Sequence, residues 1–298
     1  MIGLRFRSAV LLAAVSGLGV LAFVWPLVVA PDGATSAEMA HATDAPWIFM
    51  LLLPLLMAVI LAELVDGVID AKAIAIMGVL VAVGSALRLP STGVAGFELV
   101  FFLLIPAGRV FGRGFGFVLG ALTLFASALM TGGVGPWLPF QMFAAAWVGF
   151  FAGCLPPARG RREIALLAAY GAVAGLAYGL AMNLWFWPFG APTGSDLSYV
   201  AGAGIGENLG RFWVFHLATS LGWDLPRAAT NVVLIVVFGP AVLAALRRVS
   251  RRAAFGVVVS FGGAPRVADA QRAAGDGCDR VPGVGSEGTP VAGSVHPR

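Results

Sequence analysis

The chain has 298 residues, of which 59% are hydrophobic and only 11% are charged, and its formal net charge is +4. Soluble domains carry about 25% charged residues, so a chain with so few cannot cover its surface with groups that water solvates. The positive charge does not indicate nucleic-acid binding, because the arginines gather at the ends of apolar blocks, where they orient membrane helices. The composition therefore predicts an all-α integral membrane protein.

Long apolar blocks follow one another along the chain and predict about eight transmembrane helices. They occupy residues 8–29, 47–65, 73–87, 97–108, 114–130, 137–155, 163–185 and 228–246. The longer blocks reach the roughly 20 residues that cross a hydrocarbon core of about 30 Å, whereas 73–87 and 97–108 are short. The first block is longer than a secretory signal core of about 7–15 residues, so we interpret it as a helix that stays in the protein.

The distribution of positive charge predicts the orientation. If 97–108 crosses the membrane and 209–221 does not, most basic residues fall on one side. That side holds Arg5, Arg7, Lys72, Arg109, Arg113, Arg159, Arg161, Arg162, Arg247, Arg248, Arg251 and Arg252, and the other holds Arg88, Arg211 and Arg227. Since positive residues favour the cytoplasmic side, we expect both termini in the cytoplasm of a multi-pass cell-membrane protein. Segment 209–221 is then expected to be a partial helix that dips in from outside.

The predicted helices divide the chain into three parts. Residues 1–70 hold two helices joined by an external acidic loop, and residues 71–252 hold the other six. Residues 253–298 are rich in Gly, Ala and Pro and predict a disordered cytoplasmic tail. The two cysteines fall in a helix and in this tail, and the three histidines are scattered, so we expect neither a disulfide nor a metal or cofactor site.

No common catalytic motif is present, and we expect no enzyme activity. The sequence contains no Gly-x-Ser-x-Gly and no phosphate-binding loop, so the chain cannot use ATP by itself. His216 and Ser220, four residues apart, would share one helix face, as an intramembrane hydrolase or transferase would require. The more ordinary interpretation is that both side chains bond to local backbone or to interfacial water.

Polar side chains in apolar surroundings mark the predicted ligand site. A polar group in lipid costs several kcal/mol unless it is paired, so such positions usually line a cavity. The predicted substrate-binding residues are Arg88, Glu98, Trp137, Gln141, Asn183, Trp185, Trp187, Asn208, His216 and Asn231. In the eight-helix arrangement they converge near the outer surface, as in a pocket for a small polar or aromatic ligand. The alternatives are an interfacial aromatic belt for the tryptophans and simple bridging between helices for the amides.

Small residues recur every four positions near the start of the third predicted helix. Ala71 is followed by Ala75, and Gly78 by Ala82 and Ala86. Such a face lets another helix approach closely, and that helix can belong to the same chain or to another subunit.

The small-residue motif "AKAIA" and several later segments carry a resemblance to a known family. The later segments are a block that begins with "ALRLPSTGVAGFELV" and ends at Gly153, followed by "YGLAMNLWFWPF", "ENLGRFWVFHLATSLGWD" and "RAATNVVL". From about residue 71 to 248 the chain resembles the S components, the substrate-binding membrane subunits of energy-coupling factor (ECF) vitamin transporters. The resemblance implies a six-helix core, with Ala71 and Ala75 on the face that meets the coupling subunit, and a ligand near the outer surface beneath "RLPSTGVAG" (88–96).

The resemblance also implies a mechanism. The S component binds a vitamin and topples in the membrane to deliver it inward, while a separate coupling subunit and two ATPase subunits supply the energy. The branch with the greatest similarity is associated with cobalamin, and thiamine-related compounds or another vitamin remain open. An intramembrane enzyme and a structural membrane subunit without a ligand are the alternative functions.

Overall fold

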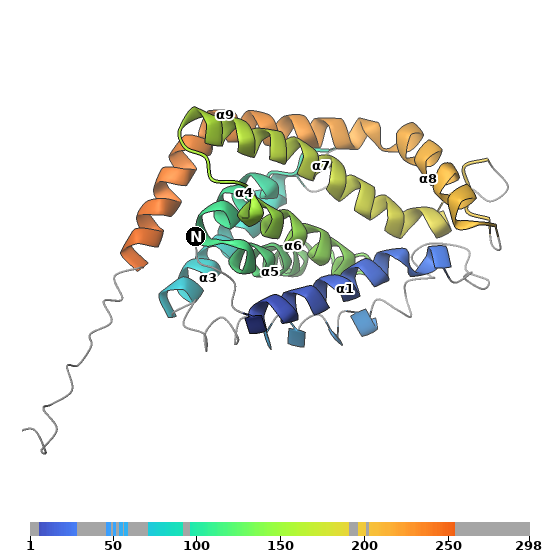
Figure 1. The fold of residues 1–298 in the computed structure, drawn as a ribbon, viewed down its shortest axis with the longest axis horizontal. Coiled ribbons are helices and arrows are strands. Elements are labelled where there is room, and N and C mark those ends of the chain that lie inside the picture. The colour runs from blue at the N-terminus through green and yellow to red at the C-terminus, as the bar shows by residue number, and fades with distance from the viewer. Residues whose placement is uncertain are drawn as a thin grey trace, which may run out of the picture. The chain divides into compact units, whose positions relative to one another are not determined.

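Every regular element that the structure describes is helical (Figure 1). The computed structural model describes residues 6–28, 46–48, 50–51, 54–55, 57–58, 71–91, 96–190, 196–200 and 203–253. The elements are α1 (Phe6–Val28), α3 (Ala71–Arg88), the 3-10 turn η1 (Leu89–Ser91), α4 (Val100–Phe111), α5 (Arg113–Thr131), α6 (Leu138–Cys154), α7 (Arg161–Gly190), α8 (Ile205–Thr219) and α9 (Leu221–Ala253). Most of the predicted helix 47–65 and nearly all of the tail 253–298 lie outside the described residues.

The described helices match the predicted blocks, with one clear correction. The last block was predicted to begin at residue 228, but α9 already begins at Leu221. The predicted block left out Asp224 and Arg227, whereas in the structure these two residues pair with each other inside the helix. Most of segment 209–221 belongs to α8, which begins at Ile205 and ends at Thr219. Helix α9 follows after Ser220.

Three of the described helices are long and apolar enough to cross a membrane. They are Arg113–Thr131, Arg161–Phe189 and Leu221–Arg251, and shorter apolar helices cover Ala9–Val24, Val100–Phe111 and Leu138–Cys154. These lengths support a membrane protein, while the number of eight crossings stays a prediction.

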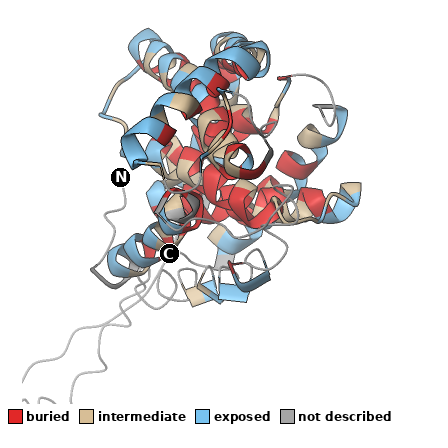
Figure 2. Ribbon diagram, turned by 90° about the vertical axis from the view of Figure 1, so that its right-hand side faces the viewer, coloured by how far each residue is buried: buried red, intermediate tan, exposed pale blue. Residues whose placement is uncertain are grey.

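Helices α5 and α6 pack backbone against backbone at the centre of the bundle. A Cβ atom on Gly116 would lie 2.3 Å from the carbonyl oxygen of Gly149, and a Cβ atom on Gly149 would lie 2.1 Å from that of Gly116. One turn further along α5, a Cβ atom on Gly120 would lie 2.3 Å from the carbonyl oxygen of Ala145. Small residues at four-residue spacing permit this approach. Buried residues accordingly gather inside the bundle, and exposed residues cover its outer helix faces (Figure 2).

The two ends of α4 mark two ends of the bundle, about 17 Å apart by helical rise. The end that holds Arg88, Glu98 and Gln141 is called the polar end. The end that holds Arg109 and Arg247 is called the basic end.

At the basic end, Oε1 of Glu163 on α7 lies 3.0 Å from Nε of Arg109 on α4 and 2.6 Å from a guanidinium nitrogen of Arg247 on α9. This buried carboxylate therefore ties three helices together.

Helix α1 packs on the bundle, although it precedes the predicted six-helix core. The ring of Phe23 meets Phe140 of α6 edge-on, with 5.2 Å between ring centroids. The indole nitrogen of Trp147 donates a hydrogen bond to Oγ of Ser16 over 3.3 Å. One turn after Phe23, at the C-terminal end of α1, Leu27 joins an apolar cluster with Trp187 and with residues of α8. These contacts connect α1 to α6 and to the segment around α8.

Candidate functional site

Four charged or aromatic side chains form a group at the polar end, referred to below as the charged cluster, of which three are buried and Glu98 is half-buried. A guanidinium nitrogen of Arg227 donates a hydrogen bond to Oδ1 of Asp224, one turn earlier on α9, over 2.6 Å. Nε of Arg227 lies 3.4 Å from Oε2 of Glu98, which precedes α4. The same guanidinium stands over the ring of Tyr178 on α7, 5.3 Å from its centroid. Charges are buried at a large desolvation cost, which this pairing offsets in part.

His216 of α8 connects the charged cluster to α7 through Asn183. The side-chain nitrogen of Asn183 lies 2.8 Å from Nδ1 of His216, and it also donates a hydrogen bond to Oγ of Ser220. If the amide donates to Nδ1, the neutral imidazole carries its proton on Nε2, which faces Oδ2 of Asp224 at 3.8 Å. Among the described residues, the side chains of His216 and Ser220 thus bond to Asn183 and not to each other, while the backbone N–H of Ser220 donates to the carbonyl of His216. This pattern does not favour a serine nucleophile activated by histidine.

The hydrogen bonding of the charged cluster is incomplete. Among the described buried side-chain atoms, Oε2 of Glu98, Oδ2 of Asp224 and Nε of Arg227 have no hydrogen-bond partner. Oδ1 of Asn231, two turns after Asp224, has none either, although its amide nitrogen donates to the carbonyl of Gly171 over 2.9 Å. A buried unsatisfied group costs about 1–3 kcal/mol. Oε2 of Glu98 and Nε of Arg227 face each other at 3.4 Å, so a ligand with hydrogen-bond donors would recover this cost mainly at Oδ2 of Asp224 and Oδ1 of Asn231.

A second polar contact at the same end joins α3, α5 and α6. The guanidinium of Arg88 donates hydrogen bonds to Oε1 of Gln141 over 3.1 Å and to Oγ of Ser127 over 3.2 Å. The carboxylate of Glu98 interacts electrostatically with both Arg88 and Arg227. The two polar groups therefore act on the same carboxylate.

The described end of the predicted ligand-covering loop, 88–96, lies against α9. Gly96 has φ +70°, and a Cβ atom on it would stand 2.3 Å from the carbonyl oxygen of Trp223 and 2.8 Å from Cβ of Pro226. Only glycine permits both this backbone conformation and this close approach. The loop therefore ends beside the turn of α9 that carries the charged cluster, while residues 92–95 lie outside the described residues.

The remaining predicted site residues make contacts that shape the surrounding structure. The indole nitrogen of Trp137 donates to the carbonyl of Gly133 over 3.2 Å and closes the turn between α5 and α6. The amide of Asn208 exchanges two hydrogen bonds with the backbone of Val200, each of 3.0 Å. Trp187 is fully buried, and its indole nitrogen donates a hydrogen bond to the carbonyl of Leu197. Trp185 is also buried, with 6.1 Å between its ring centroid and that of Phe140.

Three residues of the charged cluster, Asp224, Arg227 and Tyr178, are not among the predicted substrate-binding residues. Arg227 was interpreted as an external loop charge, and Asp224 was not weighed. The signal is present in "WDLPRAATN", because Asp224, Arg227 and Asn231 are spaced three and four residues apart and therefore share one helix face. That face continues directly into an apolar block, which is the pattern of a buried polar site.

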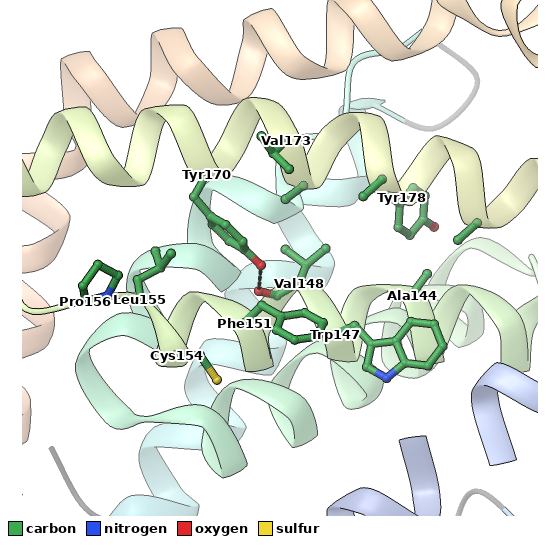
Figure 3. A pocket seen from close by; sticks show the side chains of 13 residues that line it. Ala144, Trp147, Val148, Phe151, Cys154, Leu155, Pro156, Tyr170, Val173 and Tyr178 are labelled. Atoms are coloured by element: carbon green, nitrogen blue, oxygen red, sulfur yellow. Dashed lines mark hydrogen bonds between the residues drawn. The ribbon is translucent and has the colours of Figure 1, made fainter. Parts of the chain in front are cut away.

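An apolar groove of about 450 Å³ lies between α6 and α7 (Figure 3). Trp147, Phe151 and Val173 contribute to its walls, and the hydroxyl of Tyr170 is occupied by a 2.6 Å hydrogen bond to the carbonyl of Val148. The residues that line the groove include none of the ten predicted substrate-binding positions. Its surface offers few polar groups to orient a nutrient, so we place the candidate site at the charged cluster.

A helical bundle with apolar outer faces and helices long enough to cross a membrane defines an all-α membrane protein, and this one carries a polar cluster at one end. Comparison with protein families matches residues 72–239 to the family described as "ECF transporter, substrate-specific component". The match covers more than half of the chain, and the chain belongs to this family. The comparisons found no matching curated protein and no matching solved structure.

The family confirms the resemblance seen in the sequence at the level of the S component. The members of this family are transporter components and not enzymes. Membership implies association with ECF coupling and ATPase modules in a membrane. The match does not identify a branch of the family, so the cobalamin branch stays a prediction.

Proposed function

We propose that this chain binds a vitamin or a related small nutrient at the charged cluster and passes it inward with a separate coupling subunit and two ATPase subunits. The observation that carries the proposal is the cluster of Asp224 and Arg227, which are buried, and Glu98, which is half-buried, with incomplete hydrogen bonding among the described residues. A structural subunit without a ligand would have no reason to keep these unsatisfied groups, because apolar residues of similar volume are often neutral or more stable.

The chemistry of the cluster defines the ligand that fits it. Oδ2 of Asp224 and the amide oxygen of Asn231 call for N–H or O–H donors, whereas Oε2 of Glu98 and Nε of Arg227 already face each other. Tyr178 and Trp185 provide aromatic surface near the same end of the bundle. Cobalamin, with its peripheral amides, meets these requirements and is the ligand that the resemblance favours. Other nutrients that carry both amide and ring groups meet them as well.

The outer face of α3 supports the proposed partner. Ala75, Gly78, Ala82 and Ala86 are all exposed in the single chain, and a Cβ atom on Gly78 would meet nothing within 4 Å. The side chain of Ala71 lies outside the described residues. A small-residue face that the described residues leave open is suited to close approach by a helix of another subunit, which we propose is the coupling subunit.

The proposed orientation places the polar end outside the cell and the basic end in the cytoplasm. Arg109, Arg161 and Arg247 lie at the basic end, as the concentration of positive charge on the cytoplasmic side requires. A nutrient would then reach the charged cluster from outside, past the loop that ends at Gly96.

Mass spectrometry of small molecules extracted from the purified protein tests this function. We expect one nutrient to be retained by the wild-type chain and by Asp196→Asn, a control that alters an exposed carboxylate outside the cluster. Asp224→Asn keeps the size of the buried side chain but removes its charge, and we expect it to lose the nutrient. Equal retention by Asp224→Asn and the wild type would refute the charged cluster as the site.

A further inference from the structure

A groove at the basic end, distinct from the proposed nutrient site, combines arginines with an apolar wall. Its volume is about 550 Å³, and it lies between α7 and α9. The first turn of α7, from Gly160 to Ile164, forms one side. The other side is a single stripe of α9 that begins at Val236 and ends at Arg247. Val236 and Arg247 are eleven positions apart, which corresponds to about 16 Å along the helix, so the groove is long.

The polar part of the groove has a net positive charge. Arg161 and Arg247 line it, and the side chain of Arg247 is 45% exposed although it pairs with Glu163. Glu163 also pairs with Arg109, so one carboxylate is shared by two arginines while Arg161 adds a third positive charge. The helix dipole at the start of α7 adds to the positive potential. This part of the groove is therefore suited to an anion.

The rest of the groove is apolar. Val236 and Pro240 are exposed, and Ile164 and Leu243 complete the wall. These residues belong to segments that are long and apolar enough to cross a membrane, and the arginines stand where those segments end. A soluble anion would contact the arginines alone. A molecule with an anionic head and a hydrocarbon tail would contact both parts.

We propose that this groove binds one anionic phospholipid, with its phosphate between Arg161 and Arg247 and an acyl chain along α9 toward Val236. Basic pockets between transmembrane helices at the cytoplasmic surface bind anionic lipid headgroups in this manner. The bound lipid would fill the space between α7 and α9, the two helices that also carry Tyr178 and Asp224 at the polar end. The site is separate from the charged cluster, so the proposal stands independently of which nutrient is transported.

Native mass spectrometry of the purified full chain tests the lipid site, with phosphatidylglycerol and phosphatidylcholine of identical acyl chains as probes. We expect phosphatidylglycerol to be retained in preference to phosphatidylcholine. Arg161→Ala should lower its retention about fivefold, the effect of one basic residue near an anionic headgroup. The matched control is Arg162→Ala, which removes the same charge from the next, exposed residue but not from the groove wall. Val236→Trp should also lower retention, because it fills the apolar part without changing any charge.

Three results would overturn the lipid site. The first is equal retention of both lipids, which would indicate binding by the apolar wall alone. The second is an equal loss in Arg161→Ala and Arg162→Ala, which would indicate diffuse attraction to a basic surface. The third is displacement of phosphatidylglycerol by an equal concentration of soluble glycerol phosphate, which would indicate an anion site that makes no use of the acyl chain.

Discussion

Arg227 of α9 reaches Glu98, the residue two positions before α4, with 3.4 Å between Nε and Oε2. The same arginine holds Asp224 at 2.6 Å, so one buried cation serves two carboxylates from different parts of the chain. This relationship closes the polar end of the bundle, and it brings together residues that are 129 positions apart in the sequence, from 98 to 227.

Removal of the arginine should therefore destabilise the protein strongly. Arg227→Gln leaves the buried carboxylate of Asp224 and the half-buried carboxylate of Glu98 without this cation. Breaking a buried ion pair from one side costs about 3–5 kcal/mol. The measurement is the thermal stability of the purified protein in detergent. Arg211→Gln is the control, because Arg211 pairs with Glu207 at 3.2 Å in an exposed i,i+4 geometry worth about 0.3–0.5 kcal/mol. Equal stability of the two variants would show that the cluster is solvated and not buried.

The backbone contact of α5 with α6 should not tolerate a side chain. In Gly149→Leu the new Cβ atom would overlap the carbonyl of Gly116, so the two helices must separate and the yield of monodisperse protein should fall sharply. Gly78→Leu adds the same side chain to α3, where a Cβ atom meets nothing within 4 Å, and should leave the yield unchanged. Size-exclusion chromatography of both variants measures the difference. A normal elution profile for Gly149→Leu would contradict this packing.

Gln141 should influence ligand affinity through Arg88. Gln141→Leu removes the acceptor at 3.1 Å and frees the guanidinium to shift relative to Glu98. We expect the affinity for the nutrient extracted from the wild type to fall about tenfold, equivalent to about 1.4 kcal/mol, with normal membrane insertion. Equilibrium binding measures this change. Thr131→Val, at the same end but bonded only to its own helix backbone at Ser127, should bind normally. Unchanged binding by Gln141→Leu would mean that its amide only bridges helices.

The exposed face of α3 should be required for coupling and not for binding. Ala75→Leu places a bulky side chain on this face and should block co-purification with the coupling subunit while the nutrient stays bound. Ala169→Leu makes the same exchange at an exposed position of α7 and should leave the complex intact. Pull-down of the coupling subunit, with bound nutrient measured on the same sample, separates the two effects. Normal assembly of Ala75→Leu would assign the small-residue face another role.

Much of the helical arrangement could be predicted because apolar block length depends only on local sequence. The start of α9 could not be, since Asp224 and Arg227 are compatible with a helix interior only through each other and through Glu98. The predicted grouping of Glu98, Gln141, Asn183 and His216 near one end rested on counting membrane crossings. The structure places the four residues at the polar end, and their role in binding stays a prediction.

The tryptophans and Asn208 show where composition alone is ambiguous. The same side chain can face a ligand, a membrane interface or the backbone of its own chain. Trp187 and Asn208 hydrogen-bond the backbone around residues 197–200, and these contacts depend on a fold that brings α7, α8 and the intervening segment together. The local sequence does not predict such contacts.

The central claim is that the charged cluster receives a nutrient from outside the cell, and the most direct test is the sidedness of the two ends. Asp196→Cys at the polar end and Arg159→Cys at the basic end are compared in a chain that carries Cys154→Ala and Cys278→Ala. A membrane-impermeant maleimide should label Asp196→Cys in intact cells and should label Arg159→Cys only after permeabilisation. Labelling of Arg159→Cys in intact cells, with Asp196→Cys protected, would place the charged cluster toward the cytoplasm and contradict the account.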